Sequence, residues 1–279
     1  MWGIAGLFVR KLSEFGVSPA GTVFYRCFFT VLIIGAVMLT VNKNGFKIHI
    51  KDLWIFIANG AFSIVMFNFC YYQTMRLSTL AVAAVLLYTA PIFVMIMSVF
   101  LFNEKINVKK ALAVIMAFIG CAFVSGVVGN AVKISLPALI YGLLTGFGYA
   151  LYTVFSNILI KRGYGALAVI FYTFVFAAVD SVFLTAFSGQ TVLFGAPAKV
   201  LVWAVFMAAF NTVLPYILYT NGLKFTDASR APVIATIEPV AATVLGLFYG
   251  ERLTLFGVLG IILVLSSVII INLKSGEKV

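Results

Sequence analysis

The chain has 279 residues, of which 63% are hydrophobic and only 10% are charged, and its formal net charge is +11 at pH 7. Soluble domains average roughly 45–50% apolar and about 25% charged residues, so the composition excludes an ordinary water-soluble fold. The basic residues stand in ones, twos and threes between apolar runs, which argues against a nucleic-acid-binding surface.

Ten apolar segments follow one another along the chain, and all but the first are long enough to cross a hydrocarbon core of roughly 30 Å. The connections between them are short and rich in polar and small residues. Because the segments lack the alternating pattern of barrel strands, they predict an all-α membrane protein. The segments are 1–9, 19–41, 53–75, 79–102, 109–128, 136–160, 166–187, 200–222, 230–250 and 254–273.

The first segment is too short to cross a bilayer. From Met1 to Val9 there is room for about 14 Å of helix before Arg10 and Lys11. The basic start and small-residue cleavage site of a signal peptide are missing. We therefore interpret this segment as the second half of a spanning helix, so that the first of ten transmembrane helices is truncated at its N-terminus.

The two halves of the chain resemble each other. When Pro91 is aligned with Pro239, residues 86–105 and 234–252 each form an apolar run that contains the proline and closes with an acid-base pair. This offset, near 147, predicts a first five-helix repeat over 1–128 and a second over 136–273. Because five is odd, the repeats should have opposite orientations in the membrane, as in many secondary transporters.

The distribution of lysine and arginine predicts which side faces the cytoplasm. If the complete first helix starts inside, twelve basic residues are cytoplasmic and six are external, which places the carboxyl terminus in the cytoplasm. The internal set is Lys43, Lys47, Lys51, Lys105, Lys109, Lys110, Lys161, Arg162, Lys224, Arg230, Lys274 and Lys278. The external set is Arg10, Lys11, Arg76, Lys133, Lys199 and Arg252.

Several short motifs resemble those of a known family. They are Trp2-Gly3, Tyr25-Arg26, and the proline helices ending Phe102-Asn103-Glu104 and Tyr249-Gly250-Glu251. Together they resemble the EamA-type permeases of the drug/metabolite transporter superfamily, over nearly the whole chain. The resemblance implies a ten-helix permease of two inverted five-helix repeats, but its degenerate motifs do not specify the solute.

Three ionisable residues lie well inside the apolar segments: Arg26, Asp180 and Glu238. Such groups are costly in hydrocarbon and usually face a bundle interior or a water-filled cavity, so each is a candidate for substrate or proton binding. Glu238 lies nearest the midplane and can bind a proton or the cationic part of a solute. Arg26 and Asp180 lie about seven residues from the outer helix ends, where an anchoring or ion-pairing role is the alternative.

Polar residues at helical spacing form stripes on three helices. Tyrosine offers an apolar ring and a hydroxyl group, which suits a cavity for small amphipathic solutes. Interhelical hydrogen bonding and aromatic belts are the alternatives. The candidate substrate-binding residues from these stripes and from the first proline helix are Asn68, Tyr72, Tyr88, Tyr149, Tyr152, Tyr216 and Tyr219.

Small and cyclic residues predict where helices bend or approach each other. Pro91, Pro215 and Pro239 lie inside apolar segments, remove a backbone donor and are candidate hinges. The spacings Gly142-x-x-x-Gly146 and Gly246-x-x-x-Gly250 predict close helix packing.

The residue pattern favours transport over catalysis. There is no phosphate-binding loop, the single histidine lies in a basic loop, and the three cysteines lack metal-ligand spacing, so we expect no enzyme activity, cofactor, metal or nucleic acid. We expect a multi-pass cell-membrane permease that moves a small metabolite or amphipathic solute, in the export direction, by alternating access. The alternatives are a channel-like or non-transporting membrane protein and, with less support, an intramembrane enzyme.

Overall fold

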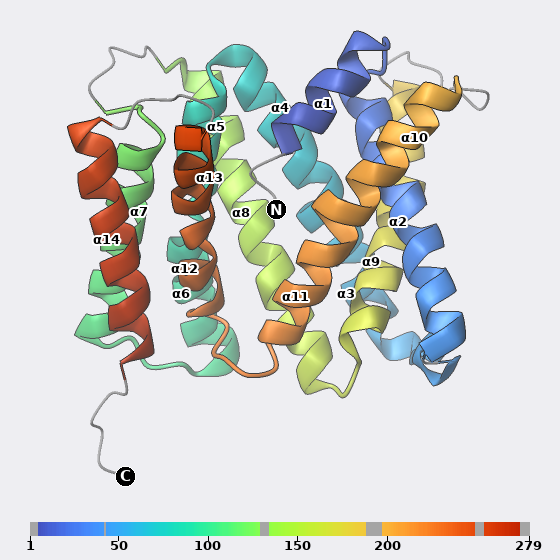
Figure 1. Ribbon diagram of the computed structural model, residues 1–279. Helices are drawn as coiled ribbons and strands as arrows, with labels where there is room; N and C mark the ends of the chain where they lie inside the picture. Colours follow the sequence, from blue (N-terminus) through green and yellow to red (C-terminus); the bar gives the residue numbers. More distant parts are fainter. Residues whose placement is uncertain (1–4, 42, 129–133, 188–196, 249–253, 274–279) are drawn as a thin grey trace. The chain divides into compact units, whose positions relative to one another are not determined.

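The computed structural model describes residues 5–41, 43–128, 134–187, 197–248 and 254–273, and these ranges contain helices and no strands (Figure 1). Seven helical stretches in them are long and apolar enough to cross a membrane. They are Pro19–Val41, Ile50–Leu77, Leu80–Phe102, Leu136–Lys161, Ala166–Thr185, Ala198–Gly222 and Leu255–Asn272, and Ala231–Val244 is a shorter apolar helix. The expectation of an α-helical, multi-pass membrane protein is confirmed.

The described residues form α-helices together with short 3-10 and π-helical segments (η), and several of the spanning stretches contain more than one of these elements. Their bounds are α1 Ala5–Glu14, α2 Pro19–Val41, η2 Lys43–Phe46, η3 Ile50–Asp52, α3 Leu53–Gly60, η4 Ala61–Met66, α4 Phe67–Leu77, α5 Leu80–Leu87, α6 Ala90–Phe102, α7 Val108–Val124, α8 Leu136–Lys161, α9 Ala166–Phe187, α10 Ala198–Phe206, η5 Met207–Val213, α11 Leu214–Gly222, α12 Ala231–Ala235, α13 Ile237–Phe248 and α14 Leu255–Asn272.

The first helix ends later than the apolar pattern suggested. We placed its end at Val9, but α1 continues through two basic residues to Glu14. Lys11 donates to the Glu14 carboxylate over 2.8 Å, and Arg10 lies 3.8 Å from the same group. These pairs at helical spacing stabilise the polar last turn, which a hydropathy pattern does not detect. The Trp2-Gly3 and Tyr249-Gly250-Glu251 motifs lie outside the described residues.

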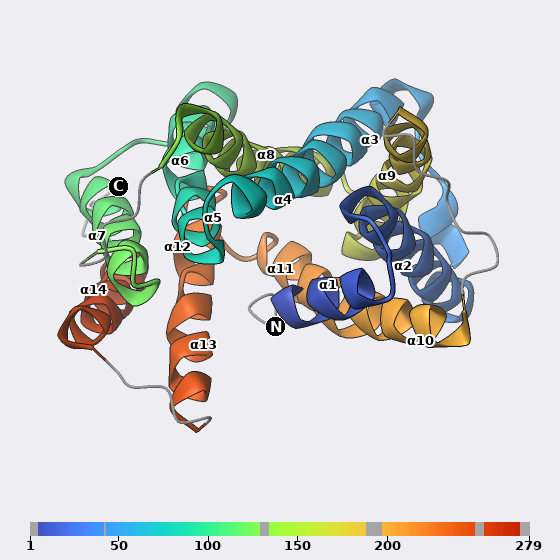
Figure 2. The ribbon, with the colours of Figure 1, turned by 90° about the horizontal axis from the view of Figure 1, so that it is seen from above.

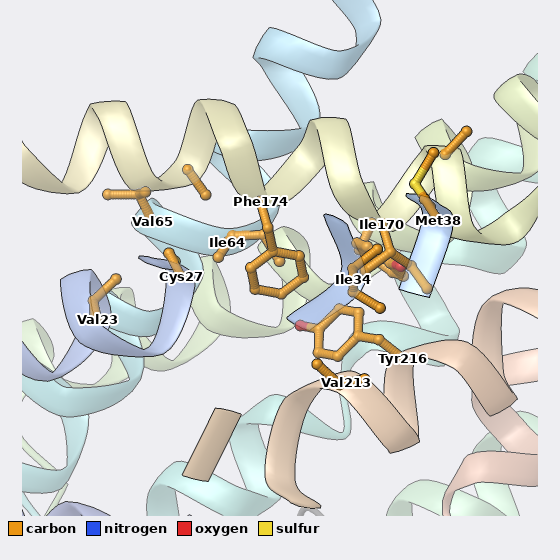
Figure 3. Close-up of a cluster of buried hydrophobic side chains, with 13 residues drawn as sticks. Val23, Cys27, Ile34, Met38, Ile64, Val65, Ile170, Phe174, Val213 and Tyr216 are labelled. Atoms are coloured by element: carbon orange, nitrogen blue, oxygen red, sulfur yellow. The ribbon is translucent and has the colours of Figure 1, made fainter. Parts of the chain in front are cut away.

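The chain forms two compact units, and each unit takes helices from both halves of the sequence. Unit 1 consists of Met1–Tyr72 and Leu151–Phe225. Its core lies where α2 packs against α9 and against the segment η5. Figure 3 shows Phe174 of α9 beside Tyr216 of α11, with their ring centroids 5.1 Å apart in an edge-to-face arrangement. Ile34 of α2 belongs to the same buried cluster.

Unit 2 consists of Gln73–Ala150 and Thr226–Val279. Within it α7 and α14 run side by side in opposite directions (Figures 1 and 2). Their backbones approach most closely at Gly120 and Gly260. A Cβ atom added to Gly120 would lie 2.9 Å from the Gly260 carbonyl oxygen, and one added to Gly260 would lie 2.7 Å from the Gly120 carbonyl oxygen. The contact therefore requires glycine on both helices.

The predicted packing role of Gly142 and Gly146 is confirmed in unit 2. A Cβ atom on Gly142 would lie 2.7 Å from the Cβ of Leu86, and one on Gly146 would lie 2.9 Å from the Leu86 carbonyl oxygen. These small residues let α8 approach α5 closely. In the second predicted pair, Gly250 lies outside the described residues.

Replacing Gly120 by alanine should destabilise unit 2, because the added methyl group meets the backbone of α14. Overpacking of this kind typically costs about 1–3 kcal/mol. The change should lower the thermal unfolding midpoint of the purified protein in detergent. Gly222→Ala is the matched control, since a Cβ atom there meets no atom within 4 Å. Equal midpoints for the two variants would contradict the described helix contact.

The α-helix is interrupted before each of the three predicted hinge prolines. In unit 2, α5 ends at Leu87 before Pro91, and α12 ends at Ala235 before Pro239. In unit 1, the π-helical turns of η5 precede Pro215. A proline cannot donate to the carbonyl one turn earlier, which accounts for the interruptions. That these sites bend during a functional cycle stays a prediction.

Candidate functional site

The most polar part of unit 1 is built around a buried arginine on α2. Arg26 is only 5% exposed. Its Nε donates to the Thr212 hydroxyl oxygen over 2.8 Å, and its Nη1 donates to Oδ1 of Asn68 over 2.7 Å. These two acceptors come from different helical stretches, so the arginine joins three parts of the unit.

Two tyrosines complete the surroundings of this guanidinium group. The ring centroid of Tyr216 lies 6.0 Å from the Arg26 Cζ atom, within the range of a cation–π contact. The hydroxyl groups of Tyr72 and Tyr216 also lie close to the guanidinium. We refer to Arg26, Asn68, Tyr72, Thr212 and Tyr216 as the Arg26 cluster. Within the described ranges its cation forms no salt bridge with a carboxylate.

Two π-helical segments position the acceptors of the cluster. Thr212 lies within η5, and Asn68 lies just after η4. A π-helical turn accommodates an extra residue and changes the direction of the side chains around it, and such turns are frequent at functional sites. The Asn68 amide group donates to the Ile64 carbonyl oxygen over 2.7 Å. That bond directs the Asn68 carbonyl oxygen toward Arg26.

A second set of polar contacts adjoins the cluster between α8 and α11. The Tyr152 hydroxyl hydrogen-bonds to Thr220 over 2.7 Å, and the Tyr219 hydroxyl hydrogen-bonds to Thr153 over 2.7 Å. The rings of Tyr152 and Tyr216 meet edge to face with centroids 4.8 Å apart. Tyr152 of the stripe predicted on α8 therefore meets Tyr216 and Tyr219 of the stripe predicted on α11 within unit 1.

Six of the predicted site residues thus come together in unit 1, and two of their hydrogen-bond partners were not predicted. The six are Arg26, Asn68, Tyr72, Tyr152, Tyr216 and Tyr219. The missed partners, Thr153 and Thr220, each follow a predicted tyrosine in the sequence. Their positions next to tyrosines of the predicted stripes were the sequence signal that could have identified them.

Asp180 belongs to the same unit but stays apart from these contacts. It lies on α9, and its Oδ2 atom is buried without a hydrogen-bond partner. It forms no ion pair with Arg26 or any other described cation. An acceptor of this kind is unusual in a folded protein, so Asp180 remains a candidate for binding a proton or a cation.

The other three predicted residues belong to unit 2. Glu238 lies in the first turn of α13 and is partly buried, and it has no hydrogen-bond or ion-pair partner within the described part of the chain. Tyr88 ends α5 and packs in a buried cluster with Cys121 and Val240. Tyr149 packs against a separate cluster of small apolar side chains.

The structure also contains ionic contacts that the sequence did not predict, because we treated their basic members, Lys110 and Arg162, only as topology signals. In unit 2, Glu104 accepts from the Lys110 amine over 3.1 Å, from the Ala228 amide over 3.1 Å and from the Ser229 hydroxyl. Asp227 lies 3.4 Å from the same lysine.

In unit 1, Asp52 accepts hydrogen bonds from Arg162 and from the Tyr164 hydroxyl. Glu104 and Lys110 are only six residues apart in the sequence. Glu104 reaches Ala228 and Ser229, and Asp52 reaches Arg162 and Tyr164, across more than 100 residues. Each group ties the ends of helices from the two halves of the chain together.

Comparison with curated proteins finds relatives named as transporters. An uncharacterized transporter of Archaeoglobus fulgidus is 31% identical over 223 residues, covering 74% of this chain and 74% of the relative. The uncharacterized inner membrane transporter YicL of Salmonella typhimurium is 25% identical, covering all of this chain and 93% of the relative. The uncharacterized transporter YxxF of Bacillus subtilis is 26% identical, covering 87% of this chain and 77% of the relative.

The fold is also known from another protein. One solved crystal structure superposes with a TM-score of 0.76 at 17% identity, covering 98% of this chain and 93% of that one. The model of the EamA-like transporter family matches this chain twice, over residues 1–126 and 136–273. The chain therefore belongs to the EamA-like transporter family, as a multi-pass membrane protein.

Proposed function

We propose that this protein is a secondary transporter that exports a small metabolite or amphipathic solute by alternating access. The observation that carries the proposal is the Arg26 cluster, a set of charged and polar side chains buried within apolar helices. Ionisable groups at membrane depth are costly and commonly mark substrate or ion pathways. Membership in a family of transporters supports the same function.

Alternating access would follow from two inverted five-helix repeats, and the helix boundaries support that architecture. The helices α2 and α9 begin at Pro19 and Ala166, and α7 and α14 begin at Val108 and Leu255; both pairs differ by 147 residues. The π-helical segments η4 and η5 end at the same spacing. Locally irregular structure that recurs at a fixed interval supports a repeated unit more strongly than hydropathy does.

The pairing of these helices supports the inversion. Within unit 2, Gly120 of α7 meets Gly260 of α14, while Val114 shares a buried cluster with Ile271. Later residues of one helix therefore contact earlier residues of the other, so the pair is antiparallel. An antiparallel pair of corresponding helices is what two inverted repeats produce.

The orientation in the membrane can be tested by chemical labelling. Because basic residues are retained on the cytoplasmic side, single cysteines at Lys47 and Lys109 should be shielded from an impermeant thiol reagent in intact cells. A cysteine at Gly189 should react. The described native cysteines are all buried, so the unmodified chain provides the background. Labelling in the reverse pattern would overturn the orientation.

Transport itself can be tested with the purified full-length protein in liposomes. A screen of metabolites released by cells that express the protein supplies candidate solutes, and the liposomes then test each for saturable uptake and counterflow. A transporter should accelerate exchange when unlabelled solute is present on the opposite side. Flux without saturation or counterflow would favour a channel, and no flux would favour a non-transporting protein. Chemical conversion of a lipid would instead indicate an intramembrane enzyme.

A further inference from the structure

We propose that the Arg26 cluster binds the anionic group of the transported solute, and that the solute is therefore a small organic anion with a carboxylate and an apolar part. This inference rests on the proposed transport function and specifies its substrate class. It is carried by the buried guanidinium group, by its neutral partners and by the aromatic rings beside it.

The buried charge of Arg26 favours an anionic ligand. A buried cation without a counter-ion loses most of its hydration, and neutral hydrogen-bond acceptors replace only part of that stabilisation. Within the described residues Arg26 is bonded to an amide and a hydroxyl group and forms no salt bridge. Asp180, the acidic residue of α9, does not pair with it. A bound anion would supply the missing charge.

The hydrogen-bonding groups of the Arg26 cluster suit a carboxylate. Arginine presents five N–H donors in a planar fork that matches a carboxylate. Thr212 and Asn68 engage Nε and Nη1, and the hydroxyl groups of Tyr72 and Tyr216 lie beside the guanidinium. A tyrosine hydroxyl both accepts and donates. The two hydroxyls can therefore turn from the arginine to a carboxylate that docks on it.

The aromatic rings beside Arg26 suit the apolar part of the solute. Tyr216 makes an edge-to-face contact with Phe174 (Figure 3), at a centroid distance of 5.1 Å, and a second one with Tyr152, at 4.8 Å. Aromatic rings next to a charged group suit a ligand that has an apolar body and one charged end. Since Arg26 is only 5% exposed here, binding requires the opening of unit 1 that an alternating-access cycle would provide.

The test compares acids with their uncharged amides. The full-length protein in lipid nanodiscs is titrated by calorimetry, at constant ionic strength, with acetate and acetamide, benzoate and benzamide, and octanoate and octanamide. At least one carboxylate should bind ten-fold or more tightly than its amide. Arg26→Gln should remove this difference while changing amide binding less than three-fold, and Arg26→Lys should retain part of it. Arg76→Gln, at an exposed arginine outside the cluster, should behave as the unmodified protein.

Two results would overturn the proposal. One is that the unmodified protein binds no carboxylate more tightly than the corresponding amide, a result that requires no variant. The other is an Arg26→Gln protein that keeps the full preference. Should Arg26→Gln fail to fold, Tyr72→Phe takes its place and should weaken carboxylate binding at least three-fold; an unchanged preference in that variant would also count against the site.

The outcome also separates this inference from the proposed function. Saturable counterflow of neutral solutes without carboxylate preference would reject the anion site and keep the transporter. Carboxylate binding that depends on Arg26, with no counterflow of any solute, would keep the site and reject the transporter.

Discussion

Glu238→Gln is expected to abolish concentrative transport and its dependence on pH, while leaving expression and membrane insertion unchanged. The carboxyl group lies in the first turn of α13, partly buried and without a described partner. Protonation of such a group breaks no ion pair within the described residues. The carboxyl group can therefore take up and release a proton as access alternates between the two sides of the membrane. Glutamine keeps the shape and removes the titration. The measurement is solute uptake into liposomes with and without an imposed pH gradient.

The exchange reaction provides the control for this prediction. Glu238→Gln should still catalyse solute counterflow, because exchange without net movement requires no proton. Glu14→Gln, at an exposed glutamate on α1, should accumulate solute as the unmodified protein does. If Glu238→Gln retained pH-dependent accumulation, Glu238 would be a packing residue. Asp180, with its unpartnered buried oxygen, would then become the candidate for proton binding.

Glu104→Gln should destabilise unit 2 strongly. The Glu104 carboxylate accepts from the Lys110 amine, the Ala228 amide and the Ser229 hydroxyl. The side chains of Glu104 and Lys110 are only 14% and 11% exposed. Glutamine removes the nearer carboxylate and leaves Lys110 only Asp227, which lies 3.4 Å away and is 46% exposed. Loss of one partner of a largely buried ion pair typically costs about 3–5 kcal/mol.

The measurement is the unfolding midpoint in detergent at neutral pH. Glu14→Gln is again the matched control, because its pairs with Arg10 and Lys11 are exposed and surface pairs contribute little. A midpoint for Glu104→Gln as high as that of the control would mean that the contact between Glu104 and Lys110 adds no net stability. Asp227 lies 3.4 Å from the same lysine and would then be its main partner.

The helices were predictable from sequence because a membrane leaves little choice of structure. Each backbone group in hydrocarbon must be satisfied within its own segment, so an apolar run of sufficient length becomes a helix. The expected segments 19–41 and 166–187 coincide with α2 and α9. The same physical constraint made Arg26, Asp180 and Glu238 conspicuous, since ionisable residues are rare at such positions.

The interruptions were only partly predictable. Prolines indicated where a backbone donor is missing, and the helices break before Pro91 and Pro239. No local signal indicated the π-helical turns of η4 and η5, because a change of one residue per turn leaves the hydropathy pattern intact. Those turns position Asn68 and Thr212, so the shape of the candidate site depends on a feature that no sequence pattern indicated.

Composition and residue patterns were therefore enough to predict the fold class, the positions of most helices, the family and the rare ionisable residues within the helices. Which of those residues meet depends on tertiary packing. Arg26 binds Asn68 and Thr212, which lie 42 and 186 residues away along the chain, and Glu104 reaches Ser229 across 125 residues. Helix formation depends on contacts within a few residues, which composition and periodicity report. Packing between distant helices depends on the shapes and directions of side chains in three dimensions, which no local pattern encodes.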